Sequence, residues 1–303
     1  RIIEPLTAMG AQITAQENFT APLIIKGVYP LKAIEYQLPI ASAQVKSAIL
    51  FAGLYADGIT RVIEKEPSRN HTERMLGLRS EHIDGSTVIS VDGGMHIPAR
   101  QFLVPADPSS AAFFIVAGLI VPQSYIVIKN VGLNPTRTGF ISILKKMNAQ
   151  LSIENEREVG GEQIGDVVVQ SSEMKTNVTL RGEIIPNIID EIPILSVAAA
   201  FAHGTFSVRD AADLRNKETD RIKAICINLR KMGLEVDEYP DGFAFESKNS
   251  IIPNEFDSFD DHRIAMAFGI ASLALNGESK ILNAECVGIS FPEFWNTIEH
   301  LQQ

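Results

Sequence analysis

The chain has 303 residues, of which 45% are hydrophobic and 21% charged, and its formal net charge is −10. This composition is typical of a globular protein, and the length allows two domains. The negative charge argues against nucleic acid as a default partner, because binding to a phosphate backbone requires a basic surface. No apolar run of about 18 residues lacks a charge or a helix breaker, so we expect no membrane span.

The chain opens on a predicted helix. Ile2, Ile3, Leu6 and Met9 recur at helical spacing, and Gly10 ends the pattern. There is no initiator methionine before this helix, and we therefore expect the sequence to be part of a longer one.

One pattern of elements then recurs four times along the chain. Each copy has a polar residue, an apolar alanine-containing helix, a short strand, a polar loop and a second helix. In three copies the polar residue lies 14 positions before a glycine, as in Gln44 and Gly58, Asp190 and Gly204, and Arg263 and Gly277. Such a unit cannot bury its apolar face alone, so we expect the copies to pack together. If they are related by rotation, several helix N-termini with their partial positive charge point at a common space.

The predicted elements follow these copies in chain order. Strands are expected at 60–63, 101–104, 125–128, 167–170, 205–208, 236–239 and 280–282. Helices are expected at 47–53, 68–76, 111–117, 138–147, 195–200, 222–232, 265–268 and 292–301. Pro105 and Pro108 stiffen the connection after the second of these strands. We interpret this connection as a boundary between a first domain at 1–104 and a second at 105–303, although an ordinary strand-to-helix loop explains it too.

The residues 213–221 form the most charged stretch, with six formal charges in nine residues, directly before the predicted helix 222–232. Backbone N–H groups at a helix N-terminus are unpaired, so phosphate or carboxylate groups bind there readily. Lys217 and Arg221 are four residues apart and can face one ligand, while Glu218 can move a proton. The alternative is a solvated first turn with Asp220 as the capping acid, which this stretch alone leaves open.

Three other polar groups open apolar helices. Residues 42–44 place a hydroxyl and an amide at a helix start, where simple capping by Ser42 is the alternative. Residues 190–191 are acids in an otherwise apolar run, and one of them could serve as a general base. The alternative is that they only interact with the dipole of the helix that follows. Residues 260–263, Asp-Asp-His-Arg, lack the spacing of metal ligands, so we expect no metal. Cys226 and Cys286 lie in apolar stretches, which is typical of buried free thiols in a reducing, cytoplasmic compartment.

Taken together, segments 38–47 (LPIASAQVKS), 68–76 (SRNHTERML), 216–221 (NKETDR) and 260–268 (DDHRIAMAF) resemble the EPSP synthase (3-phosphoshikimate 1-carboxyvinyltransferase) family. The resemblance continues in order to the closing segment 290–294. Ser-Ala-Gln in place of Ser-Ser-Gln is most similar to a bacterial subgroup of this family.

The resemblance implies an α/β architecture, the two-domain enolpyruvyl transferase fold, in which each domain holds three βαβαββ units. Residues 1–104 would then be the C-terminal part of an incomplete first domain, and 105–303 a second domain of three units. It also implies the reaction, in which the 5-hydroxyl of shikimate-3-phosphate adds to phosphoenolpyruvate and phosphate leaves. The family uses no metal or organic cofactor. We expect a cytoplasmic monomer whose partners are these two small molecules, with no nucleic acid and no membrane.

The resemblance also implies roles for individual residues. Asp190 would be the general base. Glu218 would be the acid that protonates the methylene carbon of phosphoenolpyruvate, and Lys217 would be the group that bridges the two reactants. Phosphoenolpyruvate would contact Gln44, Arg221 and Arg263. Shikimate-3-phosphate would contact Ser42, Ala43, Gln44, Arg69, Asp190 and Lys217.

The chain departs from the family pattern at three places. Ile289 stands where some members have a lysine, and Asp213 where some have an asparagine. A carboxylate at 213 would repel the substrate phosphate, so that role is not carried over. The lysine, the Gly/Thr loop and the arginine of the family's first segment are absent from this sequence. We therefore expect this fragment itself to be weakly active or inactive.

Two alternatives remain beside the leading interpretation. The same fold also serves enolpyruvyl transfer to UDP-N-acetylglucosamine, although the Lys-Glu-Thr-Asp-Arg and Asp-His-Arg segments with Ser-Ala-Gln favour shikimate-3-phosphate. The other alternative is an inactive fragment of the synthase, which folds and binds anions but performs no chemistry.

Overall fold

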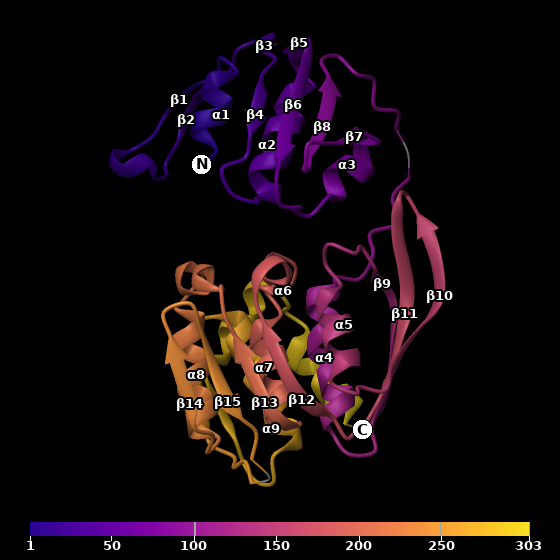
Figure 1. Cartoon of the computed structure of the whole chain (residues 1–303), viewed down its shortest axis with the longest axis vertical. Helices are drawn as coiled ribbons and strands as arrows, with labels where there is room; N and C mark the ends of the chain where they lie inside the picture. Colours follow the sequence, from indigo (N-terminus) through magenta and orange to yellow (C-terminus); the bar gives the residue numbers. More distant parts are fainter. Residues whose placement is uncertain (100, 249, 303) are drawn as a thin grey trace. The chain divides into compact units, whose positions relative to one another are not determined.

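The computed structural model describes residues 1–99, 101–248 and 250–302, and the chain divides into two compact units (Figure 1). Unit 1 comprises Arg1–Leu103 and Glu158–Glu162, and unit 2 comprises Val104–Arg157 and Gln163–Gln303. The first unit thus includes a short segment from far along the chain, which the predicted division after residue 104 did not assign to it. Among the described residues, no helix combines the length and the apolar character needed to cross a membrane.

Unit 1 is built around a four-stranded sheet with the order β4-β6-β8-β7. The chain runs β4, α2, β6, α3, β7, β8, and β4 is parallel to β6, so these elements form one βαβαββ unit. Helix α2 packs on β6 and β8 through a core that includes Ile49, Leu50 and Val62. The element bounds are β4 (Glu35–Gln37), α2 (Ala43–Gly53), β6 (Ile59–Glu64), α3 (His71–Leu76), β7 (Arg79–Ile83) and β8 (Ser86–Asp92).

Shorter elements precede and flank this sheet. Helix α1 lies at the predicted N-terminal position and contacts α2, and Gly10, with φ of 94°, follows it as predicted. A left-handed backbone at the end of a helix favours glycine because it has no Cβ. The bounds are α1 (Ile3–Ala8), β1 (Gln12–Thr14), η1 (Glu17–Phe19), β2 (Ile24–Lys26), β3 (Leu31–Lys32) and β5 (Ala56–Asp57).

Unit 2 begins with a three-stranded sheet of order β10-β11-β9 and two helices. The predicted strand at 101–104 is wrong, since no strand is assigned there and only an isolated bridge joins Ala106 to Val131. The physical reason is that Val104 is 84% exposed and Pro105 has no N–H to donate to a neighbouring strand. The bounds are α4 (Pro108–Ile120), β9 (Tyr125–Gly132), α5 (Gly139–Lys146), β10 (Leu151–Val159) and β11 (Glu162–Gln170).

The middle of unit 2 repeats the topology of unit 1. Its chain runs β12, α7, β13, α8, β14, β15, and its sheet has the order β12-β13-β15-β14 with β12 parallel to β13. The bounds are β12 (Lys175–Leu180), η2 (Gly182–Ile184), α6 (Ile185–Ile188), α7 (Ile192–Ala200), β13 (His203–Val208), η3 (Ala212–Asn216), α8 (Arg221–Lys231), β14 (Val236–Tyr239) and β15 (Gly242–Glu246).

The last part of unit 2 has two short parallel strands and two helices, so it is a shorter βαβα unit. Its bounds are β16 (Glu255–Asp257), α9 (His262–Ala274), β17 (Lys280–Leu282), η4 (Ala284–Ile289) and α10 (Phe294–Leu301). The six other predicted strands all overlap observed strands, and each predicted helix overlaps an observed one. The repeated helix–strand–helix pattern of the sequence is therefore confirmed.

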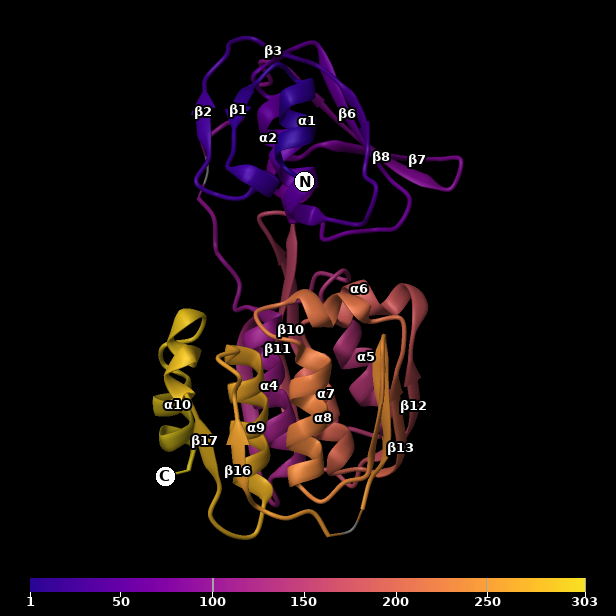
Figure 2. The ribbon, with the colours of Figure 1, turned by 90° about the vertical axis from the view of Figure 1, so that its left-hand side faces the viewer.

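The core of unit 2 is formed where the first helices of its three copies meet. Helices α4, α7 and α9 contact one another in pairs, and Figure 2 shows them side by side inside the unit. All nine residues of α7 are buried. Their small alanine side chains let the helix axes approach closely, and helices apolar on all sides belong in a protein interior. This packing brings the N-termini of α4, α7 and α9 to the same end of the unit.

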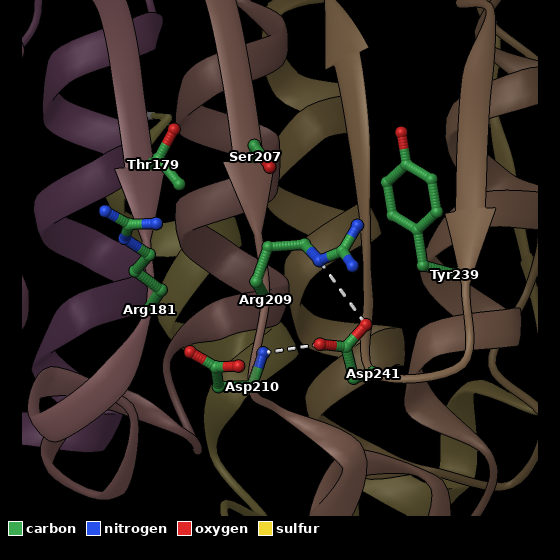
Figure 3. Close-up of a pocket in the computed structure, with 7 residues that line it drawn as sticks. All are labelled: Thr179, Arg181, Ser207, Arg209, Asp210, Tyr239 and Asp241. Carbon is green, nitrogen blue, oxygen red and sulfur yellow. Dashed lines mark hydrogen bonds and ion pairs between the residues drawn. The ribbon is translucent and has the colours of Figure 1, made fainter.

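The face of the sheet β12-β13-β15-β14 that lies opposite to α7 and α8 carries a shallow polar pocket of about 400 Å³ (Figure 3). Arg209 lies 4.3 Å from the centre of the Tyr239 ring and pairs with Asp241 at 3.4 Å. Two arginines and two aspartates line the pocket, so their charges cancel and give no surplus of positive charge for an anion. The lining residues are Thr179, Arg181, Ser207, Arg209, Asp210, Tyr239 and Asp241. None of them belongs to the predicted site.

Both cysteines are buried free thiols, as the sequence predicts. Burial raises the pKa of Cys226 to about 12, and it also raises the pKa of Cys286. Since the thiolate is the reactive form, we expect Ellman's reagent at pH 8 to react with both thiols only after urea is added. Stoichiometric reaction of the native protein would contradict this prediction, and a Cys286→Ser variant identifies which thiol reacts.

Candidate functional site

The charged stretch before α8 forms a 3₁₀ turn, η3, followed by a capped helix start. Asp220 is the N-cap residue, and its carboxylate accepts a hydrogen bond of 3.0 Å from the backbone N–H of Lys223. The capping role considered for Asp220 is thus confirmed. The alternative of a wholly solvated first turn is wrong, because the side chain of Arg221 is only 1% exposed.

The guanidinium of Arg221 lies among three carboxylates that come from different parts of unit 2. Its Nε donates to Oδ2 of Asp261 at 2.7 Å, and one terminal nitrogen donates to Oε2 of Glu218 at 2.5 Å. The other terminal nitrogen lies 3.4 Å from Oδ1 of Asp190. A buried arginine is stable only with such partners, so the three acids hold it in one orientation.

Asp190 in turn faces three cations. Besides Arg221, the ammonium of Lys217 lies 3.8 Å from Oδ1, and a guanidinium nitrogen of Arg263 lies 3.8 Å from Oδ2. Lys217, Arg263 and Asp190 all keep some exposure, and Glu218 is 50% exposed. The structure therefore brings five predicted residues of unit 2 into one cluster of paired charges that a ligand can reach.

Asp261 is a residue of this cluster that sequence analysis did not select. Its side chain is 0% exposed, pairs with Arg221, and accepts hydrogen bonds from the backbone N–H groups of Arg263 at 2.9 Å and Ile264 at 3.4 Å. One carboxylate thus caps α9 and holds an arginine of α8. The acid before an apolar helix was the available signal, but the partner 40 positions away was not visible in the sequence.

His262 follows Asp261 as the first residue of α9. Burial lowers the pKa of His262, and the neighbouring positive charge of Arg263 lowers it further. The imidazole is consequently neutral over a wider pH range than an exposed histidine, and it adds no positive charge to the cluster near pH 7.

Unit 1 holds the remaining predicted residues on α2 and on the loop before α3. Ser42 is the N-cap of α2 and accepts a hydrogen bond of 3.4 Å from the N–H of Val45, so the capping considered for it as the alternative is present. Ala43 is the first residue of α2, and Gln44 is exposed and accepts a 2.8 Å hydrogen bond from Arg1. Arg69 is partly buried in the loop between β6 and α3.

A buried ion cluster fixes that loop against α2. The ammonium of Lys46 is fully buried, 3.0 Å from Glu64 on β6 and 2.7 Å from Glu73 on α3. Glu64 also accepts a 2.8 Å hydrogen bond from the hydroxyl of Ser68. Because Ser68 directly precedes Arg69, this cluster determines where the loop carrying Arg69 lies relative to the start of α2.

The two single residues that depart from the family pattern, Asp213 and Ile289, lie on the surface of unit 2. Asp213 is exposed within η3, and Ile289 is 78% exposed at the end of η4. Among residues 1–99, 101–248 and 250–302, no group of three or more His, Cys, Asp or Glu side chains is arranged to hold a metal ion.

Comparison with known proteins identifies the family. The profile of EPSP synthase (3-phosphoshikimate 1-carboxyvinyltransferase) matches residues 1–298. The 3-phosphoshikimate 1-carboxyvinyltransferase of Prosthecochloris aestuarii is 48% identical over 100% of this chain and 71% of its own length, and that of Thermodesulfovibrio yellowstonii has the same values. A structure of EPSP synthase from Acinetobacter baumannii superposes with a TM-score of 0.89 at 43% identity, covering 99% of this chain and 69% of that one. The α/β fold inferred from the sequence is confirmed, and the chain belongs to the EPSP synthase (3-phosphoshikimate 1-carboxyvinyltransferase) family.

Proposed function

We propose that this protein transfers the enolpyruvyl group of phosphoenolpyruvate to the 5-hydroxyl of shikimate-3-phosphate and releases phosphate. The observation that carries the proposal is the cluster of Asp190, Lys217, Glu218, Arg221 and Arg263, which joins acids and cations at positions that match the family motifs. Membership of the family favours this acceptor over UDP-N-acetylglucosamine.

Asp190 and Lys217 would act on the acceptor. Asp190 takes the proton of the 5-hydroxyl as the hydroxyl oxygen attacks C2 of phosphoenolpyruvate, and the Asp190 carboxylate that receives the proton faces Lys217, Arg221 and Arg263. Lys217 is the least buried of these three cations, and it would bridge the two reactants. Ser42, Ala43, Gln44 and Arg69 of unit 1 would hold the shikimate-3-phosphate, with Gln44 also contacting phosphoenolpyruvate.

Glu218, Arg221 and Arg263 would act on phosphoenolpyruvate. Planar guanidinium groups bind carboxylate and phosphate through paired hydrogen bonds, which suits a substrate carrying both. Glu218 donates its proton to the methylene carbon as the hydroxyl oxygen bonds to C2, which gives a tetrahedral intermediate. A methyl proton then returns to Glu218 as the bond between C2 and the phosphate oxygen breaks, which forms the enol ether and releases phosphate. Since Glu218 is half exposed while Arg221 is buried, the substrate carboxylate can take the place of Glu218 at Arg221.

The scheme consists of an addition and an elimination at C2 of phosphoenolpyruvate, assisted by proton transfers and without any redox step, so the proposal includes no metal or organic cofactor. We further propose that the protein works as a monomer and that it lies in the cytoplasm, a reducing compartment in which free thiols such as Cys226 and Cys286 are typical. The alternative of an inactive anion-binding fragment makes its own prediction: the chain as printed would bind both substrates and release no phosphate.

The function is tested by phosphate release from shikimate-3-phosphate and phosphoenolpyruvate, measured on the full gene product and on the printed chain. We expect turnover that depends on both substrates, and we expect Asp190→Asn to lower kcat by about 10²- to 10⁴-fold, because the hydroxyl loses its base. Asp237→Asn, at an exposed position of β14, is the matched control. The proposal would be overturned if the full gene product accepted UDP-N-acetylglucosamine and not shikimate-3-phosphate, or if it showed no turnover with either acceptor.

A further inference from the structure

Glu191 is a buried acid to which the proposed mechanism gives no role. It directly follows Asp190, is the N-cap residue of α7, and is only 2% exposed. Its Oε1 accepts a hydrogen bond of 2.5 Å from the hydroxyl of Ser109 and lies 3.9 Å from a terminal nitrogen of Arg263. A buried carboxylate is costly unless its oxygens are paired, so these contacts are what keeps Glu191 in place.

The hydroxyl of Ser109 is itself fixed by an arginine. A terminal nitrogen of Arg137 donates to Ser109 Oγ at 2.8 Å and to Oδ1 of Asp107 at 2.7 Å. Since arginine only donates, the serine oxygen accepts from Arg137 and its O–H donates to Glu191. The hydrogen bonds therefore all donate in the same direction, from Arg137 through Ser109 to the carboxylate of Glu191.

Arg263 receives its orientation from the same two acids. One terminal nitrogen donates to the backbone carbonyl of Asp190 at 3.2 Å and faces Glu191, while the other faces the Asp190 carboxylate. The terminal nitrogens of this guanidinium are thus directed at residues 190–191. Arginine has several rotatable bonds, so fixing one edge of the guanidinium lowers the entropy lost when the remaining donors bind a ligand.

We propose that Glu191, held by Ser109 and Arg137, is a positioning residue that orients Arg263 for phosphoenolpyruvate. The inference rests on the proposed function, because it takes Arg263 as a ligand of that substrate. Ser109 and Arg137 come from the second copy of the repeat, which supplies no predicted substrate contact. That copy then supports the site instead of contacting the substrate.

Replacement of Glu191 by glutamine keeps the size of the side chain and an acceptor for Ser109 but removes the charge that faces Arg263. We expect KM for phosphoenolpyruvate to rise about tenfold, roughly the effect of one lost charge-assisted contact, with kcat changed less than about threefold. KM for shikimate-3-phosphate should stay within about twofold, since Arg263 is not assigned to it. Ser109→Ala should raise the same KM in the same sense, by releasing Glu191 from Arg137.

A double-mutant cycle separates positioning from a general structural role. In an Arg263→Ala background, Glu191→Gln should add less than about twofold to KM for phosphoenolpyruvate, because the group it acts through is gone. Glu183→Gln, at an exposed position of η2, is the matched control and should leave all constants unchanged. Fluorescence of Trp295, the single tryptophan, checks that each variant is folded before it is assayed.

The pH dependence gives a second readout. Burial raises the pKa of Glu191 and nearby Asp190 raises it further, whereas the hydrogen bond from Ser109 and the charges of Arg263 and Arg137 lower it. Protonation removes the same charge as the Gln substitution does. The ratio of KM for phosphoenolpyruvate, variant over wild type, should therefore approach one below the raised pKa and grow as the pH rises through it. Titration of the substrate itself cancels in this ratio.

The two proposals fail in distinguishable ways. Absence of turnover in the wild-type gene product would overturn the proposed function. Turnover in the wild type with an unchanged or lowered KM for phosphoenolpyruvate in folded Glu191→Gln and Ser109→Ala would overturn the positioning role alone. Full additivity of Glu191→Gln with Arg263→Ala would also overturn it.

Discussion

Replacement of Glu218 by glutamine is expected to lower kcat by about 10²- to 10⁴-fold in the full gene product, the range for loss of a general acid. Glutamine fills the same space and can still accept the hydrogen bond from Arg221 that the structure shows at 2.5 Å. The loss should therefore fall on kcat, with KM for both substrates changed only a few-fold. Steady-state phosphate release measures both constants.

Proton transfer itself can be followed separately. In D₂O the wild-type enzyme should place deuterium on the methyl carbon of the intermediate. When the intermediate reverts, the recovered phosphoenolpyruvate should carry deuterium on its methylene carbon, and Glu218→Gln should abolish this incorporation. Glu235→Gln, at a glutamate whose side chain is 90% exposed, is the control. Exchange at the wild-type rate in folded Glu218→Gln would assign the acid role to another group.

Replacement of Arg221 by methionine is expected to lower the free energy of unfolding of unit 2 by about 3–5 kcal/mol. The variant leaves Asp261, which is fully buried, without its cationic partner, and a buried unpaired charge is far more costly than the same charge in water. The prediction is checked by urea unfolding followed through Trp295, which packs on Phe294 in this unit and reports on α10 and α9.

The same helix supplies a matched control. Arg230 lies in the last turn of α8, and its side chain is 44% exposed, so Arg230→Met should change stability by less than about 1 kcal/mol. Adding Asp261→Asn to Arg221→Met removes the unpaired charge while keeping a cap for α9, and should restore part of the loss. Equal midpoints for Arg221→Met and Arg230→Met would show that the buried pair does not stabilise the unit.

Part of the site could be predicted because its signals are local. The starts of α2, α7 and α9 could be located because polar residues open an apolar helix there, and in each of these copies one such residue lies 14 positions before a glycine. The family motifs then selected Asp190, Lys217, Glu218, Arg221 and Arg263, which the structure places in one cluster. Their roles in binding and catalysis stay predictions until the variants are measured.

Other features were invisible because they depend on distant partners. Within the single charged stretch 213–221, Arg215 pairs with Asp220 and Glu238 and remains partly exposed, whereas Arg221 is buried against Asp261. Spacing along the chain does not distinguish these two arginines. The predicted strand at 101–104 is wrong for a related reason, since a strand also depends on a partner strand that is distant in the sequence.

The sequence by itself determined the fold class, the repeat, the family and the residues that match its motifs, because each of these depends on local sequence patterns and on the order in which they follow one another. Only the tertiary structure decided which charges are buried and which partners they face. Ser109 and Glu191 are 82 positions apart, and Arg221 and Asp261 are 40 apart. They meet because the alanine-rich helices α4, α7 and α9 pack closely, and α8, which begins at Arg221, packs on α7 and α9. That packing is a property of the whole core, and it gives the charged residues their partners.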